Sequence, residues 1–279
     1  MDLVNVNGSI LKRDEAGLRV DDHSYRYGEG LFETMKVAKG KILLERFHFE
    51  RLFRDVEILK LKLPALISPP MLANEVLKLC SKNNCDELSR VRLSASGGNG
   101  GLYDGDERFQ YIIECWPLEP SISKLNENGL VIGIYPEARK SCDHFSNIKS
   151  ANFLSYVMAA KYGKQQRFND CMVMNVHERI CDATTANIFW IKEEKIFTPP
   201  LSEGCIAGVM RRWLIEKMQD AGYSIGEANC EVTDLENAEE IFLTNAIHGI
   251  RWVKQFNGKM YTNSFTKNIY KEFVEPQRF

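Results

Sequence analysis

Hydrophobic and polar positions alternate in the first forty residues and then change to a helical period. Leu3–Val6 is typical of a short strand, and the Asn7-Gly8 pair that follows favours a two-residue hairpin turn. A second alternating segment, 31–37, predicts another hairpin. From Glu45 to Leu61 apolar residues recur every three or four positions, which predicts a helix that Pro64 ends.

The rest of the chain mixes strands and helices without a strict strand–helix–strand alternation, which favours an α+β fold over a doubly wound sheet. The predicted elements are a helix from Pro69, strands at Ser89–Ser94 and Phe109–Cys115, a strand at Leu130–Tyr135, a helix at Ser150–Gly163, strands at Cys171–Asn175, Asn187–Ile191 and Lys195–Thr198, a helix at Gly208–Ala221, strands at Glu240–Thr244 and Gly249–Val253, and a helix from Thr266.

A cluster of proline and polar residues without periodicity separates two halves of this pattern. We therefore expect an N-terminal α+β domain at 1–117, an interdomain linker at 118–128, and a C-terminal α+β domain at 129–279 that carries Lys149.

Charge and composition narrow the class of partner. The 279 residues include 36 Lys+Arg and 38 Asp+Glu, and a balance this near neutral gives no support for nucleic-acid or membrane-surface binding. We see no signal peptide and no apolar run long enough to span a bilayer, so we expect a cytoplasmic protein that does not bind membranes. The eight cysteines form no C-x-x-C pair and the five histidines lack ligand spacing, so we expect buried, reduced thiols and no metal.

Four positions could carry chemistry, and each also has an ordinary structural reading. Lys149 has small and apolar neighbours, which would desolvate its amine as a Schiff-base lysine requires, or it is a solvated lysine at a helix start. Asp182 precedes a buried strand and implies a cationic partner such as a protonated ring nitrogen, or it caps a turn. Arg51 could bind a phosphate or form a surface ion pair. Gly208 opens a helix whose free N–H groups could bind an anion, although many helices begin with glycine.

Five sequence blocks, in order along nearly the whole chain, resemble the class IV aminotransferases, which are fold type IV pyridoxal-phosphate enzymes. The blocks are Tyr25–Thr34, His48–Leu52, Ile148–Leu154, Asp182–Phe189 and Gly208–Arg211. The family includes branched-chain aminotransferases, D-amino acid aminotransferases and 4-amino-4-deoxychorismate lyases. The resemblance implies the two-domain α+β architecture of the D-amino acid aminotransferases, a pyridoxal 5'-phosphate cofactor and a homodimer.

The resemblance also implies a role for each matching residue. Lys149 would form the internal aldimine and act as the general base, and Arg51 would hold the cofactor phosphate. Asp182 would face the pyridine nitrogen, although the family usually has the longer Glu there, and the shorter side chain would weaken protonation of the ring. The remaining implied contacts are Val209, Met210, Ala246 and Ile247 on the phosphate, and Phe32 and Thr34 on the substrate side.

Three functions stay open at this point. The favoured one is an aminotransferase that moves the amino group of an apolar, branched-chain-like L-amino acid to a 2-oxo acid. The second is a 4-amino-4-deoxychorismate lyase that releases p-aminobenzoate and pyruvate. The Gly208–Arg211 and Asn245-Ala246 blocks resemble those of the lyases more closely than those of the branched-chain enzymes. The third is a cofactor-binding protein with little turnover, suggested by Asp182. The 97–101 loop lacks an arginine often seen in lyases and D-amino acid enzymes, and the candidates to replace that arginine are Arg26, Arg90, Arg92, His248 and Arg251.

Overall fold

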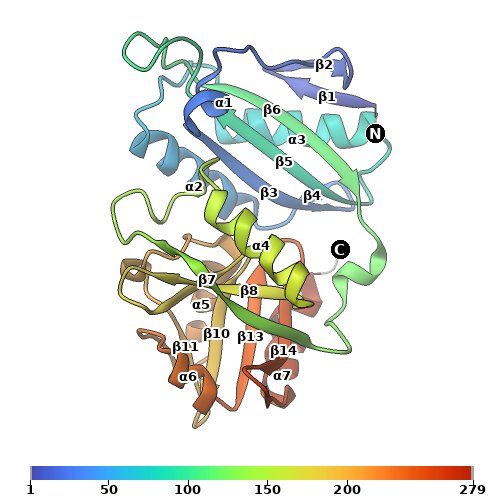
Figure 1. The fold of residues 1–279 in the computed structure, drawn as a ribbon. Coiled ribbons are helices and arrows are strands. Elements are labelled where there is room, and N and C mark those ends of the chain that lie inside the picture. The colour runs from blue at the N-terminus through green and yellow to red at the C-terminus, as the bar shows by residue number, and fades with distance from the viewer. Residues whose placement is uncertain (1, 278–279) are drawn as a thin grey trace. The chain divides into compact units, whose positions relative to one another are not determined.

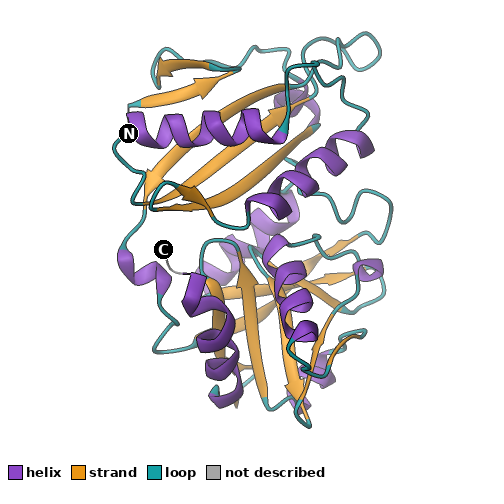
Figure 2. Ribbon diagram, turned by 180° about the vertical axis from the view of Figure 1, so that it is seen from behind, coloured by secondary structure: helices purple, strands orange, loops and turns teal. Residues whose placement is uncertain are grey.

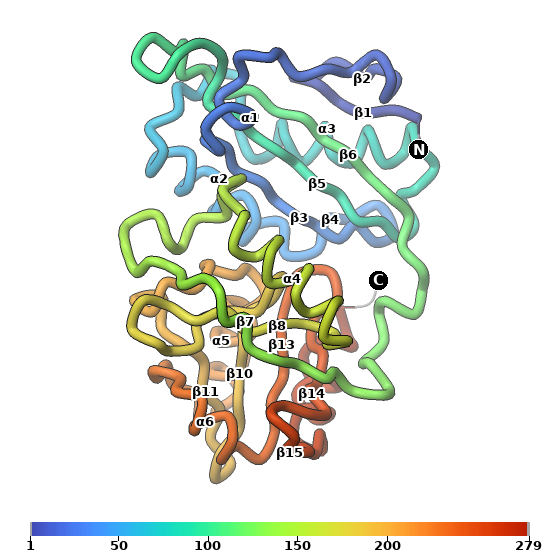
Figure 3. The backbone as a smooth tube through the Cα atoms, in the orientation of Figure 1, coloured from blue at the N-terminus to red at the C-terminus, as the bar shows by residue number. Residues whose placement is uncertain are grey.

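The computed structural model describes residues 2–277, which form two compact units (Figures 1 and 3). The first unit runs to Pro120 and includes the distant segment Ile148–Asn152. The second contains Ser121–Asn147 and the described residues from Phe153 to Gln277. The division after Pro120 falls within the segment 118–128 that the sequence marks as a linker. Lys149, which the sequence assigned to the second domain, groups by its contacts with the first unit.

An antiparallel sheet of six strands forms the first unit, and two helices cover one of its faces (Figure 2). The strand order is β2-β1-β6-β5-β3-β4. The strands are β1 (Leu3–Val6), β2 (Ser9–Lys12), β3 (Gly30–Ala38), β4 (Lys41–Ile42), β5 (Leu88–Ser96) and β6 (Gln110–Pro117), and the helices are α1 (His23–Tyr27), α2 (Glu45–Ile58) and α3 (Pro69–Lys82). Apolar side chains of α2, α3 and one face of the sheet form a single core. The opposite face of the sheet does not contact these two helices.

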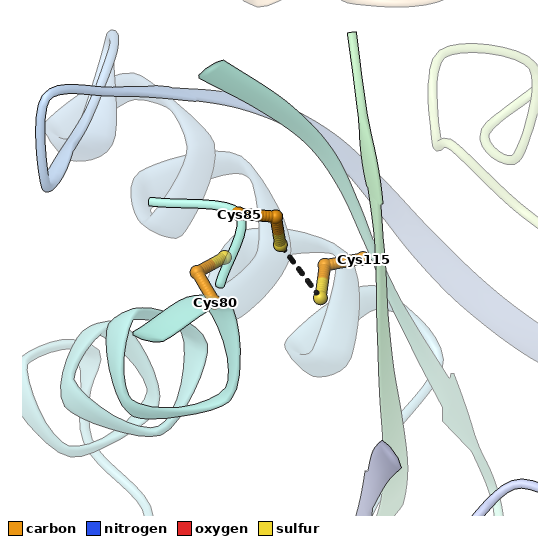
Figure 4. Close-up of side chains that lie close together, drawn as sticks. All are labelled: Cys80, Cys85 and Cys115. Carbon is orange, nitrogen blue, oxygen red and sulfur yellow. Dashed lines mark hydrogen bonds between the residues drawn. The ribbon is translucent and has the colours of Figure 1, made fainter. Parts of the chain in front are cut away.

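Three cysteines meet in this core. The Sγ atoms of Cys80, Cys85 and Cys115 lie within 4.8 Å of one another, and Cys85 donates a hydrogen bond to Cys115 at 3.3 Å (Figure 4). Burial raises the pKa of Cys85 to about 12. Buried thiols behave as small apolar side chains, so the three cysteines contribute to the packing of this core.

A curled sheet of nine strands forms the second unit, in the order β12-β11-β10-β13-β14-β7-β8-β9, with β15 paired to β14. The strands are β7 (Leu130–Lys140), β8 (Asp170–Asn175), β9 (Ile180–Ala183), β10 (Asn187–Lys192), β11 (Lys195–Thr198), β12 (Ile225–Glu227), β13 (Glu240–Asn245), β14 (Gly249–Phe256) and β15 (Lys259–Met260). The helices are α4 (Leu154–Gln166), α5 (Val209–Asp220), α6 (Val232–Asn237) and α7 (Ser264–Ile269). All six residues of β8 are buried because side chains cover the sheet on both faces. The mixed order of strands and helices confirms the α+β fold class.

Two predicted helices have different limits. The helix expected from Ser150 begins only at Leu154, because the backbone from Lys149 to Ala151 pairs with the start of β3 instead. The helix expected to reach Leu61 ends at Ile58, where Leu59 caps it and Lys60 adopts a positive φ of 56°. Within residues 2–277, no helix combines the length and the apolar character needed to cross a membrane.

Candidate active site

Lys149 is fixed by backbone pairing with β3. Its carbonyl accepts a hydrogen bond from the Phe32 N–H at 2.9 Å, and its own N–H donates to Asp55 Oδ2 at 3.1 Å. Ser150 forms an antiparallel bridge with Leu31. Because β4 is only two residues long and pairs with the far end of β3, the near end of β3 is open to this pairing. The Lys149 Nζ atom then lies 4.4 Å from the centre of the Phe32 ring.

Arg51 lies in a buried ion cluster with a residue that the sequence reasoning missed. Its Nε and Nη2 atoms donate to the two carboxylate oxygens of Glu33, at 2.7 and 2.6 Å. His48 Nδ1 contacts the same carboxylate at 2.6 Å. Burial alone would raise the pKa of Glu33, but Arg51 and His48 outweigh it and lower that pKa to about 2. Burial lowers the pKa of His48, so the imidazole is neutral and Arg51 is the charge that balances Glu33.

The sequence contains a signal for this ion cluster. Glu33 alternates with Leu31 and Met35 on the buried face of β3, and an acidic residue at such a position requires a cation. His48 and Arg51 are three residues apart on the helix that covers this face.

Phe32 and Thr34 point to the opposite face of β3. Thr34 pairs with Arg92 of β5 across the sheet, and the Arg92 guanidinium lies 3.9 Å from the centre of the Phe32 ring. Arg92 donates to Ser94 Oγ at 3.0 Å and forms no salt bridge with any described residue. Burial lowers the pKa of Arg92, and Arg90 acts in the same direction, while Glu114 across the sheet opposes them. One aromatic ring therefore has both Arg92 and Lys149 beside it.

Asp182 is enclosed in the second unit by four donors. Its Oδ2 atom accepts hydrogen bonds from the Tyr156 hydroxyl and the Ile206 N–H, each at 2.8 Å, and lies 3.4 Å from Lys140 Nζ. Its Oδ1 atom accepts one from Asn187 Nδ2 at 2.8 Å. The sequence predicted a ring nitrogen as the cationic partner of Asp182, and the structure adds Lys140 from the end of β7, 42 residues away. Burial raises the pKa of Asp182, against the opposing effect of Lys140.

Asn187 links Asp182 to the start of α5. Gly208 caps this helix, and no side chain caps it through a hydrogen bond. A Cβ atom on Gly208 would overlap Asn187 Oδ1, so only glycine lets the helix start approach this closely. Val209 and Met210 occupy the first helical positions, where backbone N–H groups lack intrahelical acceptors.

Thr244 lies directly across the sheet from Asn187, and its buried Oγ1 atom has no hydrogen-bond partner in the described chain. The next residues form a turn around Asn245, whose Oδ1 accepts from the Ile247 and His248 N–H groups at 3.1 and 2.9 Å. The N–H of Ile247 is therefore already bonded, and the phosphate contacts of Ala246 and Ile247 stay predictions from the sequence.

The predicted residues thus gather in two groups, each within one unit. Lys149 and Phe32 are in contact, with Thr34 farther along the same face and Arg51 on the buried side of the same sheet. Asp182 joins the Val209–Met210 helix start through Asn187. Asn187 also belongs to the second group and lies within the Asp182–Phe189 block of the sequence. Lys140 and Tyr156 had no signal of their own in the sequence, because separate elements bring them to Asp182.

The chain belongs to the class IV aminotransferases: the family model described as amino-transferase class IV matches residues 30–256. The family consists of enzymes that use pyridoxal phosphate. The chain is 30% identical, over 82% of its own length and 83% of the relative's, to a protein of Vibrio harveyi named aminodeoxychorismate lyase.

Solved structures share the fold at lower identity. A branched-chain aminotransferase from Thermoproteus uzoniensis, solved with norvaline, matches with a TM-score of 0.88 and 22% identity over 99% of this chain and 95% of that one. A branched-chain aminotransferase from Escherichia coli matches with a TM-score of 0.87 and 20% identity, over 100% of this chain and 96% of that one. These matches confirm the fold type IV architecture that the sequence blocks implied.

Proposed function

We propose that this class IV enzyme is a 4-amino-4-deoxychorismate lyase, which releases p-aminobenzoate and pyruvate. The observation that carries the proposal is Arg92, a half-buried cation on the same ring as Lys149 that makes no salt bridge with any described residue. Glu114, its neighbour across the sheet, is bonded to Arg13 instead. Arg90 projects from the same face of β5 two residues earlier. A substrate with two carboxylates suits two arginines, and the 30% identical relative carries the lyase name.

The cofactor phosphate has suitable partners in the second unit. Val209 and Met210 offer free N–H groups at a helix N-terminus, where the helix dipole favours an anion. Thr244 Oγ1 is a buried hydroxyl that lacks a partner among the described residues, which is costly unless a ligand supplies one. The second unit therefore fits the phosphate of pyridoxal phosphate. The role of Arg51 in holding the phosphate stays a prediction from the sequence.

In the proposed reaction the protein's own residues bind, orient and move a proton. Lys149 would hold the cofactor and, once displaced by the substrate amine, would remove the proton from the carbon that bears that amine. Asp182 would face the ring nitrogen, and Arg92 would hold a substrate carboxylate. Bound pyridoxal phosphate supplies the electron sink for the resulting negative charge. Cleavage of the neighbouring C–O bond would then release enolpyruvate and leave an aromatic ring.

Amino transfer from an apolar L-amino acid is the second candidate. The feature that favours it is the Phe32 ring beside Lys149, which offers an apolar surface to a branched side chain. Here Lys149 would return the proton to the cofactor instead of allowing a leaving group to depart. A homodimer and a cytoplasmic location stay predictions from the sequence under either function.

One incubation separates the candidates. The purified protein with pyridoxal phosphate is given aminodeoxychorismate alone, and in parallel L-Leu, L-Ile or L-Val with 2-oxoglutarate. The lyase proposal expects equal amounts of p-aminobenzoate and pyruvate from the first sample. Glutamate from the second, with no p-aminobenzoate from the first, would refute it in favour of amino transfer. Arg92→Leu should raise the KM of the lyase reaction more than Arg90→Leu does, because Arg92 is the arginine beside the Phe32–Lys149 contact.

A further inference from the structure

Asp182 already has a cation beside it before any cofactor is considered. Lys140 lies at the end of β7, with 12% of its side chain exposed, against 3% for Asp182. The Lys140 ammonium donates to the Ser146 carbonyl at 2.9 Å and to the Gly204 carbonyl, and faces Asp182 Oδ2 at 3.4 Å. An ammonium has three N–H donors, so these three oxygens account for all of them and hold Lys140 in one place.

The two oxygens of Asp182 are not equivalent. Three groups share Oδ2, namely Lys140, the Tyr156 hydroxyl and the Ile206 N–H. Only Asn187 among the described residues donates to Oδ1. A carboxylate oxygen has about two acceptor positions, so Oδ1 is the atom with room for one more donor. The arrangement directs Lys140 to one oxygen and leaves the other for an incoming N–H group.

Burial explains why Asp182 requires a cation. A carboxylate taken out of water is costly unless an opposite charge and hydrogen bonds replace its hydration. The Tyr156 hydroxyl donates to Asp182 but carries no positive charge, and neither do Asn187 or the Ile206 N–H. Lys140 is therefore the cation that balances Asp182 within the described residues of this unit.

We propose that Lys140 is the resident counter-ion of Asp182, keeping this buried carboxylate charged and oriented until the ring nitrogen of the cofactor adds a second positive charge at Oδ1. The inference rests on the proposed function for the part that concerns the cofactor. Lys140 is a positioning residue in this account, because it acts on the cofactor only through Asp182. The ring nitrogen would then bind a carboxylate that already forms an ion pair with Lys140.

Lys140→Met tests the pair, and Lys259→Met is a matched control. Lys259 also donates to two backbone carbonyls, each at 2.7 Å, and lies 5.0 Å from a tyrosine ring, but it has no carboxylate partner in the described chain. Lys140 Nζ lies 5.3 Å from the Tyr156 ring. In the full chain stripped of cofactor, Lys140→Met should lower the Tm by at least about 6 °C, since it strands a buried charge. Lys259→Met should lower it by less than half as much.

Two further measurements separate charge balance from packing. Adding Asp182→Asn to Lys140→Met removes the stranded charge, so the double variant should regain most of the lost Tm. A double variant as unstable as Lys140→Met would overturn the counter-ion role.

Reloading with pyridoxal phosphate should raise the Tm of Lys140→Met more than that of the unaltered protein, because the ring nitrogen then supplies the missing cation. An equal rise in both proteins, with rescue by Asp182→Asn intact, would overturn only the link to the ring nitrogen. If pyridoxal phosphate raises the Tm of neither protein, the proposed function itself fails.

Discussion

Replacing Glu33 with Gln removes the negative charge that balances Arg51 in the buried cluster, while it keeps the size and shape of the side chain. Glu33 is 1% exposed and holds Arg51 through two hydrogen bonds and His48 through a third. Its pKa falls from the ordinary 4.5 to about 2 in the folded chain, which corresponds to about 3 kcal/mol of stability at pH 7. The cost of breaking a buried ion pair, about 3–5 kcal/mol, is of the same size. Glu33→Gln should therefore lower the Tm by about 6–12 °C at pH 7.

The stability difference between the unaltered protein and Glu33→Gln should depend on pH. A carboxylate with a lowered folded-state pKa stabilises the fold fully above its unfolded value, and that contribution is lost as pH falls toward the folded value. The difference between the unaltered protein and Glu33→Gln should therefore be largest above pH 5 and shrink as the pH falls from 4.5 toward 2.

Urea unfolding followed by tryptophan fluorescence at several pH values measures this difference. The matched control is Glu178→Gln, which alters another two-bond Arg–Glu pair, because Arg139 donates to both Glu178 oxygens at 2.8 Å. That pair is exposed, with 64% of the Glu178 side chain accessible, so its loss should have little effect. A Glu33→Gln variant that is as stable as the unaltered protein at pH 7, or that has the same deficit at pH 3 as at pH 7, would contradict a stabilising charge on Glu33.

Three further changes probe the cofactor residues. Asp182→Asn should reduce turnover by more than tenfold and shift the visible absorbance of the loaded protein, because the ring nitrogen loses its anionic partner; an unchanged spectrum and rate would remove Asp182 from that role. Thr244→Val should leave the cofactor-free Tm nearly unchanged, since Oγ1 has no partner in the described chain, but weaken pyridoxal phosphate binding by about 0.5–1.5 kcal/mol in a fluorescence titration; unchanged affinity would contradict the phosphate contact. Gly208→Ala should destabilise the protein by about 1–3 kcal/mol in urea unfolding, because the added Cβ overlaps Asn187, and a neutral effect would show that this helix start can move.

Most helices and strands could be predicted from local sequence patterns. The hairpin at Asn7-Gly8 and the helix from Pro69 depend on residues adjacent in the chain, and both form where the sequence predicted them. The segment around Ser150 was wrongly predicted as helix, because its apolar residues have helical spacing while its backbone partners lie in β3, more than a hundred residues earlier. Pairing between distant segments leaves no trace in a local period.

The candidate site shows the same limit. The chemical types at Lys149, Asp182 and Arg51 were visible in the sequence, and so was the need for a cation near Asp182. Their partners were not, because Lys140 and Tyr156 reach Asp182 from a strand and a helix that only the folded sheet brings together. The Ile247 N–H was predicted to contact the phosphate, but in the structure it donates to the Asn245 side chain two residues away. The sequence did not show this local bond.

The attachment point of the cofactor is the central claim, and one experiment addresses it directly. The protein loaded with pyridoxal phosphate is reduced with borohydride, digested, and searched by mass spectrometry for the lysine that carries the pyridoxyl group. We expect that group on Lys149, with no labelled peptide at this position in Lys149→Ala. A pyridoxyl group on another lysine of the unaltered protein, or none after loading, would contradict it.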